Sequence, residues 1–216
     1  MNKGFVIYVS IIAFFCACFI TFNHFFAPPL APWFDDFPLW FNILGVLGST
    51  VAVIALDGAI AHICHKYQNR FDPFSRFFEV SKKQKTVLGN LGIKKIKNFL
   101  PDLGVLVKFP KDKIVDPKSK EYVYTYIVES CSGELGHLLG AFLGFLIVFI
   151  FPPGIFPLWI WLRFGVPVAL VNFVLCILPP LALRYNRYGL AQIYQRLVLR
   201  ENRQTETPKT APENKE

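Results

Sequence analysis

Three ionisable side chains lie close together between residues 129 and 137, in the stretch Glu-Ser-Cys-Ser-Gly-Glu-Leu-Gly-His. If this stretch is helical, Glu134 and His137 lie about 60° apart, and Glu129 lies about 80° from His137 on the other side. All three side chains then project from one sector of the helix surface, about 140° wide. Ionisable groups at a membrane boundary are expensive to bury and commonly functional. The pattern predicts a catalytic cluster of His137, Glu134 and Glu129.

A second polar group follows at Arg184, Tyr185, Asn186 and Arg187. The two guanidinium groups offer forked donors that suit a phosphate or a carboxylate, so these four residues are predicted to bind substrate. Each arginine taken alone is equally explained as an anchor at the membrane surface.

Other ionisable residues are weaker candidates. Asp57 is either a functional acid or the partner of a polar group on a neighbouring helix, and the sequence favours neither. His62 and His65 share one helix face, and the favoured interpretation is that they lie at the membrane interface. Glu134-x-x-His137 has the spacing of di-iron bundles, which require a second such motif. None is present, so we expect no metal site.

The composition limits the elements that can position these residues. Of 216 residues, 53% are hydrophobic and 18% are charged, Phe occurs 23 times, and the net charge is +8. A chain this apolar is predicted to be an integral membrane protein with basic loops rather than a nucleic-acid-binding protein, a disordered tail or a soluble enzyme. Its five cysteines include no Cys-x-x-Cys pair, which argues against a disulfide framework.

The predicted fold is an all-α membrane protein with four spanning helices. Four stretches are apolar over the length that a bilayer requires, at about residues 5–26, 39–64, 133–151 and 165–183. The first is interpreted as an uncleaved anchor. Residues 156–164 are expected to approach the membrane as a re-entrant or interfacial segment. Residues 1–200 form one domain, and residues 201–216 are expected to be disordered.

Lys and Arg concentrate in residues 65–132 and after residue 184, whereas residues 27–38 have none. Both termini and the long loop are therefore predicted to be cytoplasmic. Residues 71–78 are aromatic and basic and are expected at the headgroups, and the third helix is expected to start before the membrane, between residues 122 and 129. Residues 81–100 form an amphipathic segment whose lysines should attract anionic lipid headgroups.

Small residues recur at Gly133, Gly136, Gly140 and Gly144, which lets another helix backbone approach closely. Packing of a helix beside the Glu/His sector is the ordinary explanation. The same face is where a homo-oligomer would form.

Three segments together resemble the glycosyl-4,4'-diaponeurosporenoate acyltransferase family of small bacterial membrane proteins. They are residues 91–104, 129–137 and 184–190. The resemblance extends over about residues 85–200. The chain departs from the family pattern at five positions, which are Ile96, Ser132, Gly133, Leu183 and Gly189.

The resemblance implies transfer of a fatty acyl group from a cytoplasmic thioester, such as acyl-CoA, to a hydroxyl of a membrane-bound glycolipid or glycosylated isoprenoid. It implies a multi-pass protein of the bacterial inner membrane that needs no cofactor beyond the acyl donor. His137 would take the hydroxyl proton and Glu134 or Glu129 would orient it. Arg184 and Arg187 would bind negative charge, and Tyr185 and Asn186 would donate to an oxyanion. Two alternatives remain, a non-catalytic membrane partner protein and an intramembrane hydrolase, and a transporter is less favoured.

Overall fold

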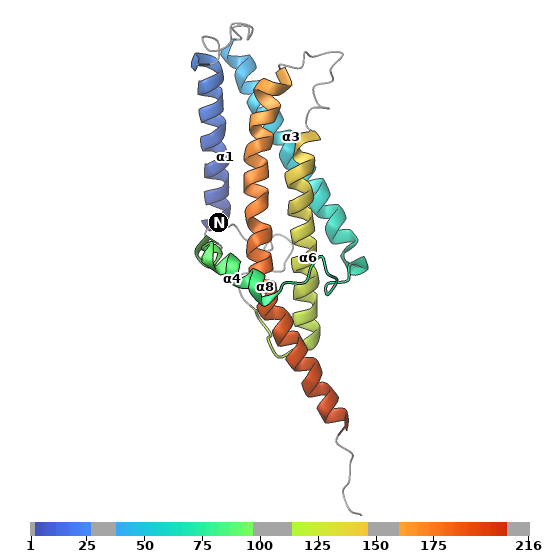
Figure 1. The fold of residues 1–216 in the computed structure, drawn as a ribbon. Helices are drawn as coiled ribbons and strands as arrows, with labels where there is room; N and C mark the ends of the chain where they lie inside the picture. The colour runs from blue at the N-terminus through green and yellow to red at the C-terminus, as the bar shows by residue number, and fades with distance from the viewer. Residues whose placement is uncertain (1–2, 27–37, 97–113, 147–159, 207–216) are drawn as a thin grey trace, which may run out of the picture.

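The computed structural model describes residues 3–26, 38–96, 114–146 and 160–206, and every regular element in these ranges is helical. Four long helices lie side by side (Figure 1), and they are α1 (Lys3–Thr21), α3 (Leu39–Lys66), α6 (Lys120–Leu143) and α8 (Val166–Glu206). Helix α1 continues into a π turn, Phe22–Phe26, and another π turn, Trp161–Gly165, leads into α8. Shorter helices are the 3-10 turn Gln68–Arg70, α4 (Lys82–Asn90) and α5 (Ile93–Ile96). The predicted all-α architecture is confirmed.

Three of the described helices are long and apolar enough to cross a membrane, namely Val6–Phe26, Leu39–Lys66 and Trp161–Gln204. The third predicted span, 133–151, falls only partly on α6, because residues 147–151 lie outside the described ranges. Helix α6 packs against both α3 and α8. It begins at Lys120, ahead of the predicted span, as the sequence indicated. A count of four spans stays a prediction.

Helix α8 extends much further than the predicted span 165–183. It passes through Pro179 and Pro180 and ends at Glu206, within the segment expected to be disordered. Each proline removes one backbone donor, yet α8 continues through both of them. After the prolines, Leu190 packs with Val123, Tyr126 and Ile127 of α6. Figure 1 shows that α8 changes direction in its lower half.

The approach to α8 also differs from the expectation of a separate re-entrant segment at 156–164. Residues 156–159 lie outside the described ranges, and Trp161–Gly165 is continuous with α8. Arg163 of this turn is buried and donates to the Asn23 carbonyl at 2.5 Å and to Asn42 Oδ1 at 3.1 Å. A buried cation needs such acceptors. Arg163 thereby joins the π turn after α1, the start of α3 and the approach to α8.

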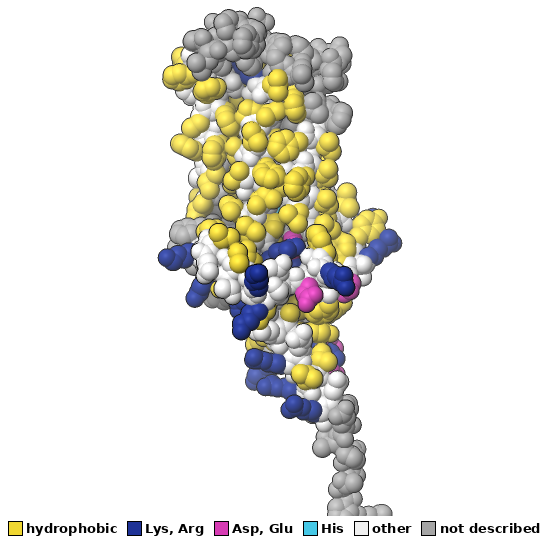
Figure 2. Space-filling model, viewed as in Figure 1, with side chains coloured by type: hydrophobic (Ala, Val, Ile, Leu, Met, Phe, Trp, Pro, Cys, Tyr) yellow, Lys and Arg dark blue, Asp and Glu magenta, His cyan; other side chains and the backbone are white. Residues whose placement is uncertain are grey.

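Helices α4 and α5 lie at the opposite end of the bundle, which we call the basic end because Lys66, the α4–α5 lysines and Arg184 gather there. A capping box starts α4, with Gln84 N donating to Ser81 Oγ and Ser81 N to Gln84 Oε1. Leu88 and Ile93 pack against Ala182 of α8. Figure 2 shows Lys and Arg side chains below the apolar band of the bundle. The predicted amphipathic segment is helical over most of its described part.

The glycine stripe of α6 packs against helices of the same chain. A Cβ on Gly136 would lie 3.6 Å from Ala61 Cα of α3, and one on Gly140 would lie 2.6 Å from Asp57 Oδ1. A Cβ on Gly144 would lie 2.9 Å from Asn172 Nδ2 of α8. This is the close packing that the spacing predicted, and α3 and α8 account for it without a second copy of the chain.

Gly140→Ala should lower the free energy of unfolding by about 1–3 kcal/mol, because its methyl group overlaps Asp57. Asp57 cannot move away without leaving Asn172 and Cys176, which lie 3.5 Å from its carboxylate oxygens. Unfolding titration in mild detergent measures the change. Gly48→Ala is the matched control, since among the described residues no atom from outside its own stretch of helix lies within 4 Å of the added methyl group. Equal stability of the two variants would show that Asp57 has room to move.

Candidate functional site

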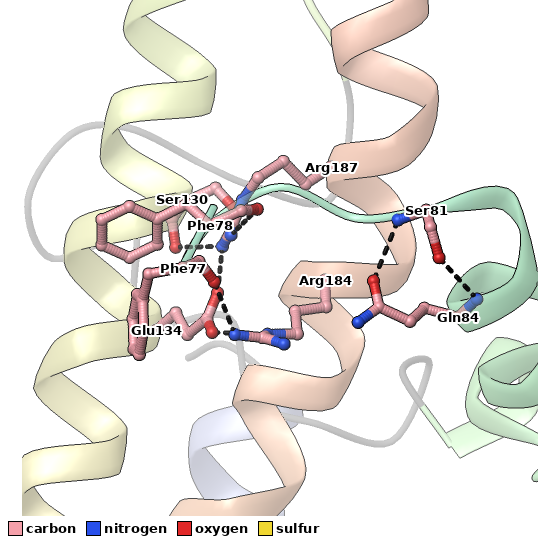
Figure 3. Close-up of polar contacts among 8 residues, drawn as sticks. All are labelled: Phe77, Phe78, Ser81, Gln84, Ser130, Glu134, Arg184 and Arg187. Carbon is pink, nitrogen blue, oxygen red and sulfur yellow. Dashed lines mark hydrogen bonds and ion pairs between the residues drawn. The ribbon is translucent and has the colours of Figure 1, made fainter. Parts of the chain in front are cut away.

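The predicted site residues of α6 and α8 meet at the basic end of the bundle. Figure 3 shows Glu134 and Ser130 on α6, Arg184 and Arg187 on α8, and Phe77 and Phe78 in the segment that precedes α4. Arg184 and Arg187 are three residues apart on one helix, so both side chains reach the same neighbour. That neighbour is Glu134.

Glu134 is fully buried, and both of its carboxylate oxygens are engaged. Arg184 Nε donates to Oε1 at 2.6 Å, and Arg187 Nη2 donates to Oε2 at 2.5 Å. Charge-assisted bonds of this length are among the stronger hydrogen bonds in proteins. Glu134 therefore ties α6 to α8 through ion pairs with both arginines.

Arg187 is 2% exposed, and its donors are directed at protein acceptors. Nη1 donates to the Phe78 carbonyl at 3.0 Å, and Nη2 donates to the Ser130 carbonyl at 3.1 Å. Nε and Nη2 each lie 3.3 Å from Ser130 Oγ. A guanidinium held in this way has little capacity left for a substrate. Its geometry favours a structural function over the predicted binding of anions.

Arg184 is more accessible, with 27% of its side chain exposed. Nη2 donates to the Phe77 carbonyl at 2.9 Å, and within the described part of the chain Nη1 has no hydrogen-bond acceptor. Of the two arginines, Arg184 is the one that can bind an anion arriving from outside the bundle.

Phe77 and Phe78 each meet one of the two arginines. Their carbonyls accept the bonds described above, and their rings lie 5.8 Å from Arg184 Cζ and 5.5 Å from Arg187 Cζ. The sequence placed residues 71–78 at the headgroups and did not predict that Phe78 packs inside the protein. This side chain is buried in the core with Val123. Backbone carbonyls leave no signal in a sequence, so only the structure identifies this contact.

Glu134, Arg184 and Arg187 form what we call the arginine cluster, and Glu129 points away from it. It is 7% exposed and accepts a hydrogen bond from Gln68 Nε2 at 2.9 Å, and His65 Nδ1 lies 3.5 Å from the same oxygen, Oε1. The predicted sector of about 140° is wide enough to face two helices. Glu129 faces the end of α3, and Glu134 faces α8. His137 is partly buried at an angular position between the two faces.

The remaining predicted residues occupy the surroundings of this cluster. Tyr185 is partly buried against Leu88 and Ile93, and Lys85 Nζ lies 6.0 Å from its ring. Asn186 is partly buried beside it on α8. Burial raises the pKa of the Cys131 thiol to about 11, so this thiol is a neutral packing group at neutral pH.

Asp57 accepts hydrogen bonds from Asn172 and Cys176 of α8, which matches one of the two interpretations left open, that of a partner for polar groups of a neighbouring helix. His62 and His65 are both exposed near the end of α3. Within the described residues, no three His, Cys, Asp or Glu side chains are grouped as metal ligands would be.

The family described as glycosyl-4,4'-diaponeurosporenoate acyltransferase matches residues 67–196. The matched region contains the arginine cluster, the α4–α5 segment and all of α6, and it begins just after His65. No curated protein and no solved structure matches the chain significantly.

Replacing Glu134 by Ala should destabilise the protein by about 3–5 kcal/mol, because it leaves the Arg187 guanidinium buried without its counter-ion. Unfolding titration in mild detergent measures this loss. Glu201→Ala is the control, since its ion pair with Lys120 is exposed and its loss should change stability little. A small effect of Glu134→Ala would contradict the structural function assigned to this carboxylate.

Proposed function

We propose that this chain, which belongs to the glycosyl-4,4'-diaponeurosporenoate acyltransferase family, transfers a fatty acyl group from a water-soluble thioester to a hydroxyl of a membrane-bound acceptor. The family name supports an acyltransferase of carotenoid biosynthesis, and the apolar helices are consistent with a membrane protein. The proposed acceptor is a glycolipid or a glycosylated isoprenoid.

The membrane arrangement proposed is four spans in the inner membrane of a bacterium, with both termini cytoplasmic. The start of α1, the end of α3 and the extension of α8 all lie at the basic end (Figure 1). Lys and Arg favour the cytoplasmic side. The exposed lysines of α4 and α5 would attract anionic lipid headgroups and hold this segment against the membrane surface.

One observation carries the proposal beyond the family name. The Glu134–Arg184–Arg187 cluster fixes a partly exposed guanidinium beside the segment that enters α4. Basic side chains lie below the apolar band of the bundle (Figure 2). A soluble donor and a membrane-bound acceptor can meet only at such a boundary. Arg184, prepositioned by Glu134 and the Phe77 carbonyl, suits a donor phosphate or the oxyanion formed during acyl transfer.

In the proposed reaction, His137 removes the proton from the acceptor hydroxyl, since imidazole exchanges protons near neutral pH. The alkoxide oxygen attacks the thioester carbonyl, the carbon–sulfur bond breaks, and the thiol leaves with a proton. The thioester is already activated, so no resident cofactor is needed. Tyr185 and Asn186 are proposed as further donors to the substrate. Arg187 and Glu134 act as positioning residues.

The burial of Glu134 and Arg187 also favours a second candidate, a non-catalytic membrane protein whose ion pairs are only structural. An intramembrane hydrolase is a further alternative and would release free fatty acid without an acceptor. Measuring the product with and without acceptor separates the three functions.

The test uses protein purified in lipid, a long-chain acyl-CoA and a membrane lipid extract, with release of free thiol as the readout. We expect release that depends on the extract, and mass analysis should find an acylated glycolipid or isoprenoid. His137→Ala should lower the rate by about 10²–10⁴-fold while the protein stays folded in the membrane.

His62→Ala is the control for loss of an imidazole near the same end of the bundle. Normal turnover by His137→Ala would exclude His137 as the base. Absence of thiol release by the wild type, together with one stoichiometric membrane partner in a pull-down, would instead support the non-catalytic candidate.

A further inference from the structure

A second histidine lies near a carboxylate at the basic end, outside the arginine cluster. His65 belongs to the last turn of α3, Gln68 to the 3-10 turn that follows, and Glu129 to α6. The His65 side chain is 47% exposed, whereas that of Glu129 is 9% exposed. An accessible imidazole is thus backed by a buried carboxylate.

The contact has the arrangement by which carboxylates orient imidazoles in acyl-transfer sites. Nδ1 of His65 faces Glu129 Oε1 at 3.5 Å, which leaves Nε2 as the nitrogen available to a substrate. The distance exceeds that of a good hydrogen bond, as is common in catalytic pairs without substrate. Gln68 Nε2 donates to the same oxygen at 2.9 Å and so holds the carboxylate in place.

Two neighbouring features suit a ligand. The Oε1 atom of Gln68 is buried and has no hydrogen-bond partner within the described residues, although buried acceptors are normally satisfied. Lys66 and Arg70 lie over the exposed ring of Tyr67, at 5.7 Å and 5.0 Å from its centroid. These cations complement a thiol carried on an anionic group, such as the phosphates of coenzyme A.

The carboxylate that His65 contacts lies on α6 nearer the basic end than His137 does. Glu129 and His137 are separated by about 12 Å along α6, at 1.5 Å per residue, and His65 contacts the Glu129 end. His137 is therefore nearer the apolar part of the bundle, where a membrane-bound hydroxyl arrives. His65 is nearer water, where a soluble thiol departs.

Resting on the acyl transfer proposed above, we infer that His65 is a second catalytic residue, which protonates the departing thiolate, and that Glu129 positions it. As the carbon–sulfur bond breaks, its electron pair moves to sulfur, and sulfur takes the proton from His65 Nε2. His65 then regains a proton from the water around its exposed side chain. His137 releases to water the proton that it took from the hydroxyl. The sum is hydroxyl plus thioester giving ester plus thiol.

The test compares two donors that carry the same acyl chain, acyl-CoA and the corresponding thiophenyl ester. An aromatic thiolate is stable enough to leave without a proton, whereas an alkyl thiolate benefits from an acid. His65→Ala should lower the rate of extract-dependent thiol release about 10²-fold with acyl-CoA and only a few-fold with the thiophenyl ester, relative to the wild type with each donor.

Matched variants separate this function from a structural one. Glu129→Gln should show the same donor preference with a smaller loss, and His62→Ala should match the wild type with both donors. His137→Ala should lose activity equally with both. Because His65 is exposed, His65→Ala is expected to stay folded, and His65→Gln provides a second variant with the same expectation.

Equal losses with the two donors in His65→Ala would overturn the assignment of His65 and leave the acyltransferase proposal standing. A wild type that releases no thiol from either donor would overturn both. A rate ratio between donors that changes only in the His65 and Glu129 variants would support the inference.

Discussion

The basic end of the bundle depends on the burial of one carboxylate between two arginines. Removing Glu134 and Arg187 from water costs several kcal/mol for each ion, and only close, well-directed bonds offset that penalty. Glu134 has those bonds at both oxygens, and Arg187 has a further set to Ser130 and Phe78. The charges can therefore stay buried only if α6 and α8 keep this relative position.

The same arginines fix the segment that enters α4. The carbonyls of Phe77 and Phe78 accept from Arg184 and Arg187, so the backbone before the capping box is held against α8. From there α4 and α5 lie with Leu88 and Ile93 on α8 and with lysines exposed. The interaction that holds the helices together thus also sets where a basic segment meets the bundle, beside the part of Arg184 that stays accessible.

The site divides between fixed and accessible groups. Arg187 and Glu134 are saturated by the protein and give rigidity, whereas Arg184, His65 and His137 retain exposure or partial exposure. Positioned groups lose less free energy to reorganisation than mobile ones, and accessible groups can contact a substrate. The polar contacts of Asp57 with Asn172 and Cys176 join α3 to α8 and belong to neither group of site residues.

The sequence by itself determined the helical class, three helices that are long and apolar enough to cross a membrane, the amphipathic α4–α5 segment and the family, because hydrophobic length, periodicity and short motifs are local properties of the chain. It also found both halves of the polar cluster. Only the tertiary structure decided which groups pair. A helical wheel of α6 places Glu129, Glu134 and His137 in one sector of the helix surface, but it carries no information about the neighbouring helices. It therefore could not show that Glu129 faces His65 and that Glu134 faces the arginines. The length of α8 was missed for the same reason, since the sequence does not show that the part after Pro179 and Pro180 packs against α6 through Leu190.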